Sequence, residues 1–181
     1  MSNALTTTAR PVAQPPCAAA GEPTQYLTFM LGGEAFAIGI LSIKEIIEYH
    51  GLTTVPMMPD CVRGVINLRG AVVPVIDLQA RFGRASSPVT KRTCIVIVEM
   101  QSADQERQVI GVLVDVVNEV IEISAGDIEP APSFGAGIRS EYIAGMGKVR
   151  GRFVILLQVD AVLSLDEGAA LTRPEEVPLL N

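Results

Sequence analysis

The segment CVRGVINLRGAVVPVIDLQARF, residues 61–82, constrains the fold of this chain more than any other stretch. Two runs rich in Val and Ile flank Arg69 and Gly70, and short β-branched runs joined by a tight turn predict a β-hairpin. Gly70 can adopt the positive φ that such a turn requires, and we expect Arg69 beside it to project into solvent. Pro74 has no backbone N–H to donate, so its strand should lie at a sheet edge or be paired on only one side there.

The hairpin pattern returns within residues 144–157, at an offset of 81 residues (145 minus 64). A second echo relates residues 43–48 to residues 117–122, at an offset of 74 (117 minus 43). Two echoes in the same order and at similar offsets indicate an internal duplication, and hence two similar β lobes. In the first echo the matched positions are Gly64 with Gly145, Arg69 with Arg150 and Gly70 with Gly151.

About ten short strands and very little helix predict an all-β fold, most simply two small closed barrels packed side by side. Brief helices are expected after Asp77 and around Asp160, each following a hairpin. A turn around Leu41 should lead into a strand in which Glu45 is exposed. Residues 124–137, rich in Gly and Pro, are expected to form a long loop.

The domain organisation follows from the composition along the chain. Residues 1–23 are expected to be a disordered tail, and residues 168–181 a frayed C-terminal tail. The folded part should span residues 24–167, with a first lobe over about 24–88 and a second over about 89–167. Exchange of strands between the two lobes is left open.

Charge and hydropathy exclude several classes of partner. The net charge of -6 and the pI near 4.8 disfavour nucleic acid and anionic membrane surfaces, which both require basic patches. No apolar run approaches the roughly 20 residues that span a bilayer, so we expect no direct membrane insertion. Three cysteines without metal-ligand spacing are typical of reduced thiols in a cytoplasmic protein.

The sequence offers little chemistry for catalysis. His50 is the only imidazole, and the carboxylates are scattered without the paired apolar setting that acid catalysis needs. No cluster of residues suggests a metal, and no glycine loop suggests a phosphate, so we expect neither a metal nor a cofactor. The excess of Val, Ile and Met indicates apolar surface between the lobes, of the kind that binds proteins. A small-ligand carrier or an enzyme that uses the cleft between the lobes is the alternative.

The run GVINLRGAVVPVIDL, with AIGILSIKEI, GVLVDVVNEVIEI and EYIAGMGKV, resembles the CheW family of chemotaxis coupling proteins. The resemblance covers residues 25–167 and implies two SH3-like five-stranded barrels. It also implies an adaptor without catalytic activity, located in the cytoplasm at receptor arrays. Its partners would be the cytoplasmic tips of methyl-accepting chemoreceptors and the regulatory domain of the histidine kinase CheA. A non-flagellar pathway that controls surface motility remains an alternative to a flagellar one.

In this family the helical receptor tip docks in a groove between the lobes, which is helix-in-groove recognition. No residue is assigned to kinase binding. We expect the surface that binds the kinase on exposed apolar parts of both lobes. Gly39 stands where relatives commonly have an acidic residue, so one polar contact near the groove is expected to be missing. The resemblance places Ile40 and Ile43 on one groove wall, Val114 and Val117 on the other, Glu45 and Arg69 at the rim, and Gly64 where a close approach is needed.

Overall fold

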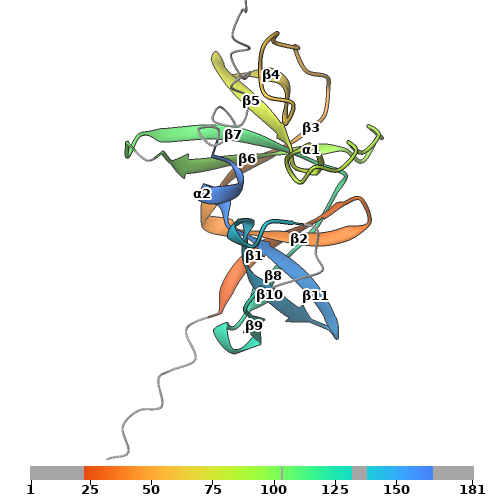
Figure 1. Ribbon diagram of the computed structural model, residues 1–181, viewed down its shortest axis with the longest axis vertical. Coiled ribbons are helices and arrows are strands. Elements are labelled where there is room, and N and C mark those ends of the chain that lie inside the picture. Colours follow the sequence, from red (N-terminus) through yellow and green to blue (C-terminus); the bar gives the residue numbers. More distant parts are fainter. Residues whose placement is uncertain (1–22, 103, 132–137, 165–181) are drawn as a thin grey trace, which may run out of the picture.

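Strands form most of the secondary structure in the computed structural model, which describes residues 23–102, 104–131 and 138–164 (Figure 1). The predicted all-β class is confirmed, while the two predicted tails lie outside the described residues except for Pro23. The strands are β1 (Thr24–Leu31), β2 (Glu34–Gly39), β3 (Ile43–Glu48), β4 (Val62–Leu68), β5 (Ala71–Asp77), β6 (Cys94–Gln101), β7 (Arg107–Val114), β8 (Val116–Ile123), β9 (Ile128–Glu129), β10 (Ile143–Val149) and β11 (Arg152–Leu157). The helices are α1 (Leu78–Arg81) and α2 (Val159–Val162), with 3-10 turns η1 (Ile40–Ser42), η2 (Ala125–Asp127) and η3 (Ser140–Tyr142).

The strands form two sheets that pack as two lobes, one above the other in Figure 1. One sheet has the order β3-β6-β7-β5-β4, and the other has the order β8-β1-β2-β11-β10-β9. β1 and β2 therefore belong with the C-terminal strands, so strands are exchanged relative to a division of the chain at residue 88. The second sheet has six strands where five were expected, because η2 and β9 occupy part of the loop predicted for residues 124–137.

The strand pairing at Pro74 fits a residue without a backbone N–H donor. It pairs with Val65 of β4, whereas the parallel pairing of β5 with β7 begins only at Val75. The strand is thus paired on one side at the proline and on both sides beyond it, which confirms the prediction.

The duplication extends to the backbone geometry of the two hairpin turns. Arg69 and Gly70 have φ values of 51° and 86°, and Arg150 and Gly151 have values of 49° and 77°. Two successive positive φ values define a type I′ turn, whose twist matches that of the flanking strands. We expected a positive φ only at the glycine, and the arginine before it also adopts one in both lobes. In the first turn the N–H of Gly70 donates to Asn67 Oδ1 at 2.9 Å.

Gly64 and Gly145 admit a short segment of the chain itself beside each hairpin. The backbone of Thr53 exchanges hydrogen bonds of 2.9 and 2.8 Å with Val65, next to Gly64. A Cβ atom at Gly64 would lie 2.5 Å from the carbonyl oxygen of Thr53, and one at Gly145 would lie 3.0 Å from that of Glu129 in β9. The close approach expected at Gly64 therefore serves the closure of its own lobe, because the loop after β3 occupies the space a partner would need.

The largest apolar core lies between the two sheets, and two smaller clusters fill the individual lobes. Aromatic rings line up within the large core: the Phe36 ring centroid lies 6.2 Å from that of Phe29 and 5.7 Å from that of Phe82. Tyr142 continues this row at 6.3 Å from Phe82. We expected an apolar cleft where the lobes meet, but buried side chains fill the seam. Partly buried side chains, among them Ile40, Ile43 and Val117, pack against this core.

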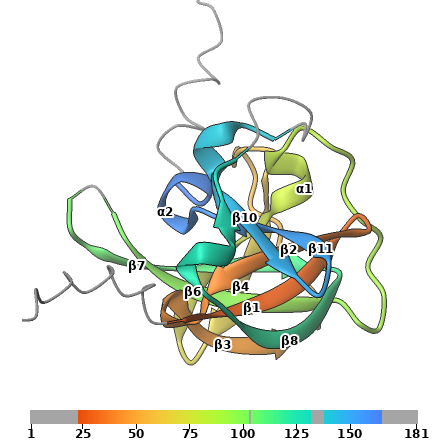
Figure 2. The same cartoon turned by 90° about the horizontal axis from the view of Figure 1, so that it is seen from below.

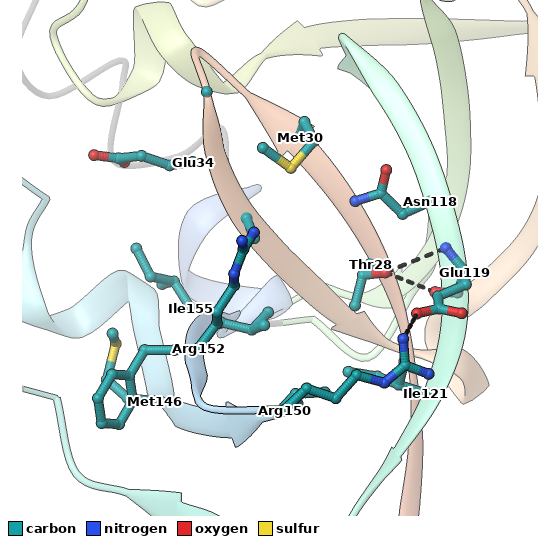
Figure 3. Close-up of a pocket in the computed structure, with 15 residues that line it drawn as sticks. Thr28, Met30, Glu34, Asn118, Glu119, Ile121, Met146, Arg150, Arg152 and Ile155 are labelled. Atoms are coloured by element: carbon teal, nitrogen blue, oxygen red, sulfur yellow. Dashed lines mark hydrogen bonds and ion pairs between the residues drawn. The ribbon is translucent and has the colours of Figure 1, made fainter.

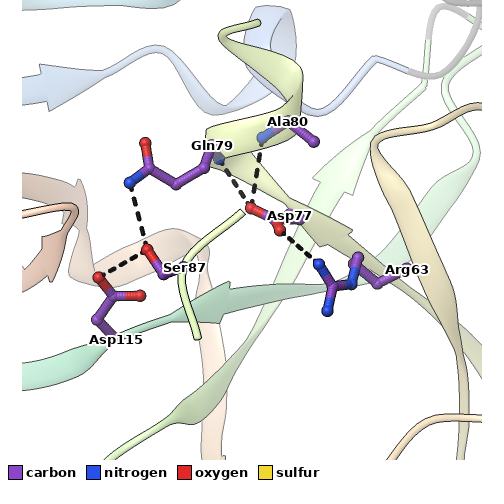
Figure 4. Close-up of polar contacts among 6 residues, drawn as sticks. All are labelled: Arg63, Asp77, Gln79, Ala80, Ser87 and Asp115. Carbon is purple, nitrogen blue, oxygen red and sulfur yellow. Dashed lines mark hydrogen bonds and ion pairs between the residues drawn. The ribbon is translucent and has the colours of Figure 1, made fainter. Parts of the chain in front are cut away.

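A polar network joins α1 to the opposite sheet (Figure 4). The buried Asp77 carboxylate caps α1 by accepting from the N–H groups of Gln79 and Ala80, and it also accepts from Arg63 at 3.3 Å. This confirms the predicted helix after Asp77. The Gln79 side chain donates to Ser87, whose hydroxyl donates to Asp115 at 3.0 Å. The second predicted helix is α2, which begins at Val159, one residue before Asp160.

The same Asp115 carboxylate accepts from the N–H of Gly32 in the turn between β1 and β2, at 2.8 Å. Asp115 itself lies between β7 and β8, where the chain passes from one sheet to the other. The two sheets are therefore joined by hydrogen bonds as well as by the shared core.

Candidate functional site

The turn η1 is one of the points where the chain crosses between the sheets. It connects β2 of the six-stranded sheet to β3 of the five-stranded sheet. Ile40 is partly buried and packs on the core between the sheets. Leu41, beside it, is 96% exposed, since a single 3-10 turn cannot direct two successive side chains inward. A nearly fully exposed leucine stabilises the fold very little, which makes it a candidate for contact with another molecule.

β3 presents apolar side chains to the rim of the seam. It is an edge strand, and its Ile43 and Ile46 lie directly opposite Val98 and Val96 of β6. Residues opposite one another in an antiparallel pair share a face, and both valines belong to the core between the sheets. Ile43 packs on this core, whereas Ile46 is 43% exposed at its edge.

β8 presents the equivalent residues from the other sheet. It is also an edge strand, and its Val117 and Val120 lie opposite Phe29 and Leu27, which are core residues of β1. Val117 is partly buried, and Val120 is 48% exposed. The assignment of Val114 to this wall is wrong, because its side chain is completely buried in the core.

These residues lie on η1 and on two edge strands that pack on the core between the sheets, and together we call them the seam strip. Figure 2 shows β3 and β8 along the same side of the molecule, and the offset of 74 relates their exposed residues in pairs. Leu41, Ile46 and Val120 were not among the predicted site residues, although the repeat places Ile46 and Val120 at equivalent positions. The seam strip consists of Ile40, Leu41, Ile43, Ile46, Val117 and Val120.

Arg69 and Glu45 form a bidentate ion pair with N–O distances of 3.0 and 2.9 Å. Glu45 was expected to be exposed and Arg69 to point into solvent, but the side chain of Glu45 is only 23% exposed and binds Arg69. A bulge after Ile43 turns Glu45 toward Ile97, inside the lobe. The pair joins β3 to the β4–β5 turn, which lies at the far edge of the same sheet. It therefore closes the barrel beside the seam strip, and Arg69 remains 73% exposed.

The other lobe repeats this closure with Arg150 and Glu119, whose side chains lie 3.5 Å apart. Glu119 lies 74 residues after Glu45, and Arg150 lies 81 residues after Arg69. Both offsets are those of the two sequence echoes. The two ion pairs are therefore equivalent in the repeat, and each one closes the barrel of its own lobe.

Little in the described part of the chain supports covalent catalysis. Burial raises the pKa of the Cys94 thiol, and the Glu48 carboxylate raises it further, so the reactive thiolate is disfavoured at neutral pH. The His50 side chain is 83% exposed, with Glu48 at 3.8 Å. Among residues 23–102, 104–131 and 138–164, no three His, Cys, Asp or Glu side chains are grouped to hold a metal. No helix within those ranges is long and apolar enough to cross a membrane.

Comparisons with known proteins find relatives that match most of this chain. Residues 25–167 match the CheW-like domain family. The chain is 35% identical to the chemotaxis protein CheW of Klebsiella aerogenes over 145 residues, which are 80% of this chain and 84% of that protein. It is 36% identical to the chemotaxis protein CheW of Helicobacter pylori over the same shares of the two chains. The crystal structure of the scaffolding protein TtCheW from Thermoanaerobacter tengcongensis superposes with a TM-score of 0.71, at 31% identity, over 80% of this chain and 90% of that one.

Proposed function

The chain belongs to the CheW family of chemotaxis scaffold proteins, and from this membership we propose that it couples methyl-accepting chemoreceptors to the histidine kinase CheA. In this role it catalyses no reaction. It holds the cytoplasmic tips of the receptors and the regulatory domain of the kinase together, at the inner face of the membrane. Receptor occupancy then controls autophosphorylation of the kinase.

The seam strip is the observation that supports this proposal. Two edge strands from different sheets offer apolar side chains to one rim, and Leu41 adds an almost fully exposed leucine. A helical receptor tip can lay an apolar face along such a strip, as in helix-in-groove recognition. A strip of six side chains gives a weak single contact, and the repetition of contacts in an array strengthens it by avidity.

Reversing the charge of Arg69 tests whether this residue contacts the receptor or only closes its barrel. We expect Arg69→Glu to lower affinity for receptor-containing vesicles about tenfold, measured by co-sedimentation. The free energy of unfolding should fall by only about 1 kcal/mol, because Arg69 is largely exposed and solvent screens the pair.

A charge swap separates the two roles. In Arg69→Glu combined with Glu45→Arg the ion pair is rebuilt with reversed polarity, so the melting temperature should recover while co-sedimentation stays low. Recovery of both would show that the pair acts only within the chain. Arg107→Glu is the matched control, since Arg107 forms an exposed ion pair with Glu99 at 3.3 Å and should leave co-sedimentation unchanged.

We expect the regulatory domain of the kinase to contact apolar side chains away from the seam strip. Val72 is 72% exposed and is held in place by β5. Its side chain therefore loses little conformational entropy when a partner covers it. Val72→Glu should weaken CheA binding about tenfold in calorimetric titration and leave receptor co-sedimentation unchanged. Val89→Glu, at a half-exposed position outside the strands, is the control. Unaltered CheA binding by Val72→Glu would exclude this surface.

A further inference from the structure

A pocket of about 710 Å³ opens where the six-stranded sheet closes into its barrel, and we call it the mouth pocket (Figure 3). The β1–β2 hairpin, β8 and the β10–β11 hairpin supply its walls. Met30, Met146 and Ile155 contribute apolar surface, and Phe153 lies at the pocket with 51% of its surface exposed. These side chains do not fill the space that they line.

The mouth pocket also holds a guanidinium group that lacks an ion-pair partner in the part of the chain that the structure describes. Arg150 is paired with Glu119, and Glu34 is paired with Arg84 at 2.9 Å. Arg152 lines the same pocket and forms no ion pair with any residue within the described ranges. In a chain with a net charge of -6, an unpaired cation beside open apolar surface favours a ligand that is both acidic and apolar.

We propose that the mouth pocket binds a segment of this same chain, residues 174–180, with the sequence Pro-Glu-Glu-Val-Pro-Leu-Leu. Glu175 and Glu176 supply the carboxylates that Arg152 can bind. Val177, Leu179 and Leu180 supply apolar side chains for the surface formed by the methionines and Phe153. The two prolines of the segment favour an extended backbone, which suits insertion at the end of a barrel.

The linker that precedes this segment is longer than β11, the strand that leads away from the pocket. β11 runs from Arg152 at the pocket to Leu157, a length of about 20 Å for six residues. The description of the chain ends at Ser164, and the nine residues 165–173 before the segment can span up to about 30 Å. A tether of this kind gives an effective concentration in the millimolar range, so even a weak site would be occupied within one molecule.

Methyl NMR of the full-length chain labelled at its methionines tests the proposal. Met30 and Met146 report on the pocket, and Met57 reports on the other lobe. Glu175→Lys combined with Glu176→Lys should shift the Met30 and Met146 signals and leave the Met57 signal in place. Glu106→Lys, at an exposed carboxylate outside the pocket, is the control and should shift neither pocket signal.

A charge reversal decides between docking and a local disturbance. Arg152→Glu should shift the two pocket signals, and its combination with the two lysine substitutions should return them toward their original positions, because the opposite charges meet again. Unchanged pocket signals in the lysine variant, or no return in the combined variant, would overturn the proposal. Signals that depend on protein concentration would also overturn it, since they would show docking between copies.

Discussion

Replacing Leu41 with glutamate is expected to weaken receptor binding about 30-fold while leaving thermal unfolding unchanged. Leu41 is 96% exposed, so the fold gains almost nothing from its side chain. Within a complex with a helical receptor tip, the same side chain would be buried. A carboxylate at that position would remove the apolar contact and place a charge without a partner in the interface. Co-sedimentation with receptor-containing vesicles over a range of protein concentrations measures the loss.

Met57→Glu provides the matched control for this prediction. Met57 is as exposed as Leu41 but lies in the loop between β3 and β4, outside the seam strip. The control variant should bind receptor vesicles like the unaltered protein. Equal losses in the two variants would mean that added negative charge alone reduces binding, and an unaffected Leu41→Glu variant would remove the seam strip from the interface.

Gly64→Ala is expected to give the largest loss of stability among the substitutions considered, about 2 to 3 kcal/mol in the free energy of unfolding. The added Cβ would lie 2.5 Å from the carbonyl oxygen of Thr53 and 3.1 Å from Leu52 Cβ. Backbone cannot move aside as a flexible side chain can, so the loop that closes the lobe must shift. For a domain of this size the melting temperature should fall by about 5 to 10 °C.

Two other glycines calibrate this effect in the same calorimetric experiment. Gly126→Ala meets open space and should leave the melting temperature unchanged, apart from small propensity effects. Gly145→Ala should give an intermediate loss, because its Cβ would approach Ile128 at 2.6 Å and the carbonyl oxygen of Glu129 at 3.0 Å. Equal melting temperatures for Gly64→Ala and Gly126→Ala would show that the loop with Leu52 and Thr53 can shift without a measurable loss of stability.

Features encoded by neighbouring residues were predictable from the sequence. The tight turn at Arg69 and Gly70, the capping carboxylate of Asp77 and the one-sided pairing at Pro74 each depend on a few adjacent residues. The duplication was also visible, because equivalent turns need the same residue types at the same spacing. Local chemistry therefore predicted the hairpins and the fold class.

Features that depend on long-range strand pairing were harder to predict from the sequence. The placement of β1 and β2 beside β8 and β11 joins segments about 90 to 120 residues apart, and apolar alternation does not specify which strand a given strand will pair with. The same limit affects the candidate site. Val114 and Val117 look alike in the sequence, but only the crossing between sheets determines that the first is buried and the second reaches the rim.

The partner of Glu45 was missed because Arg69 lies 24 residues away at the opposite edge of the sheet. The second echo also relates two exposed residues that were not among the predicted site residues. It pairs Ile46 with Val120 at an offset of 74, and both are exposed apolar residues on edge strands. Comparison of the two halves of a duplicated chain can therefore reveal surface residues that a single hairpin does not.

The most direct test of the account measures CheA autophosphorylation in vesicles that contain a chemoreceptor, with and without this protein. We expect the protein to make kinase activity depend on the receptor ligand, and the Leu41→Glu variant to lose most of this effect at the same concentration. A kinase that responds to the receptor equally well when the protein is absent would contradict the proposed role.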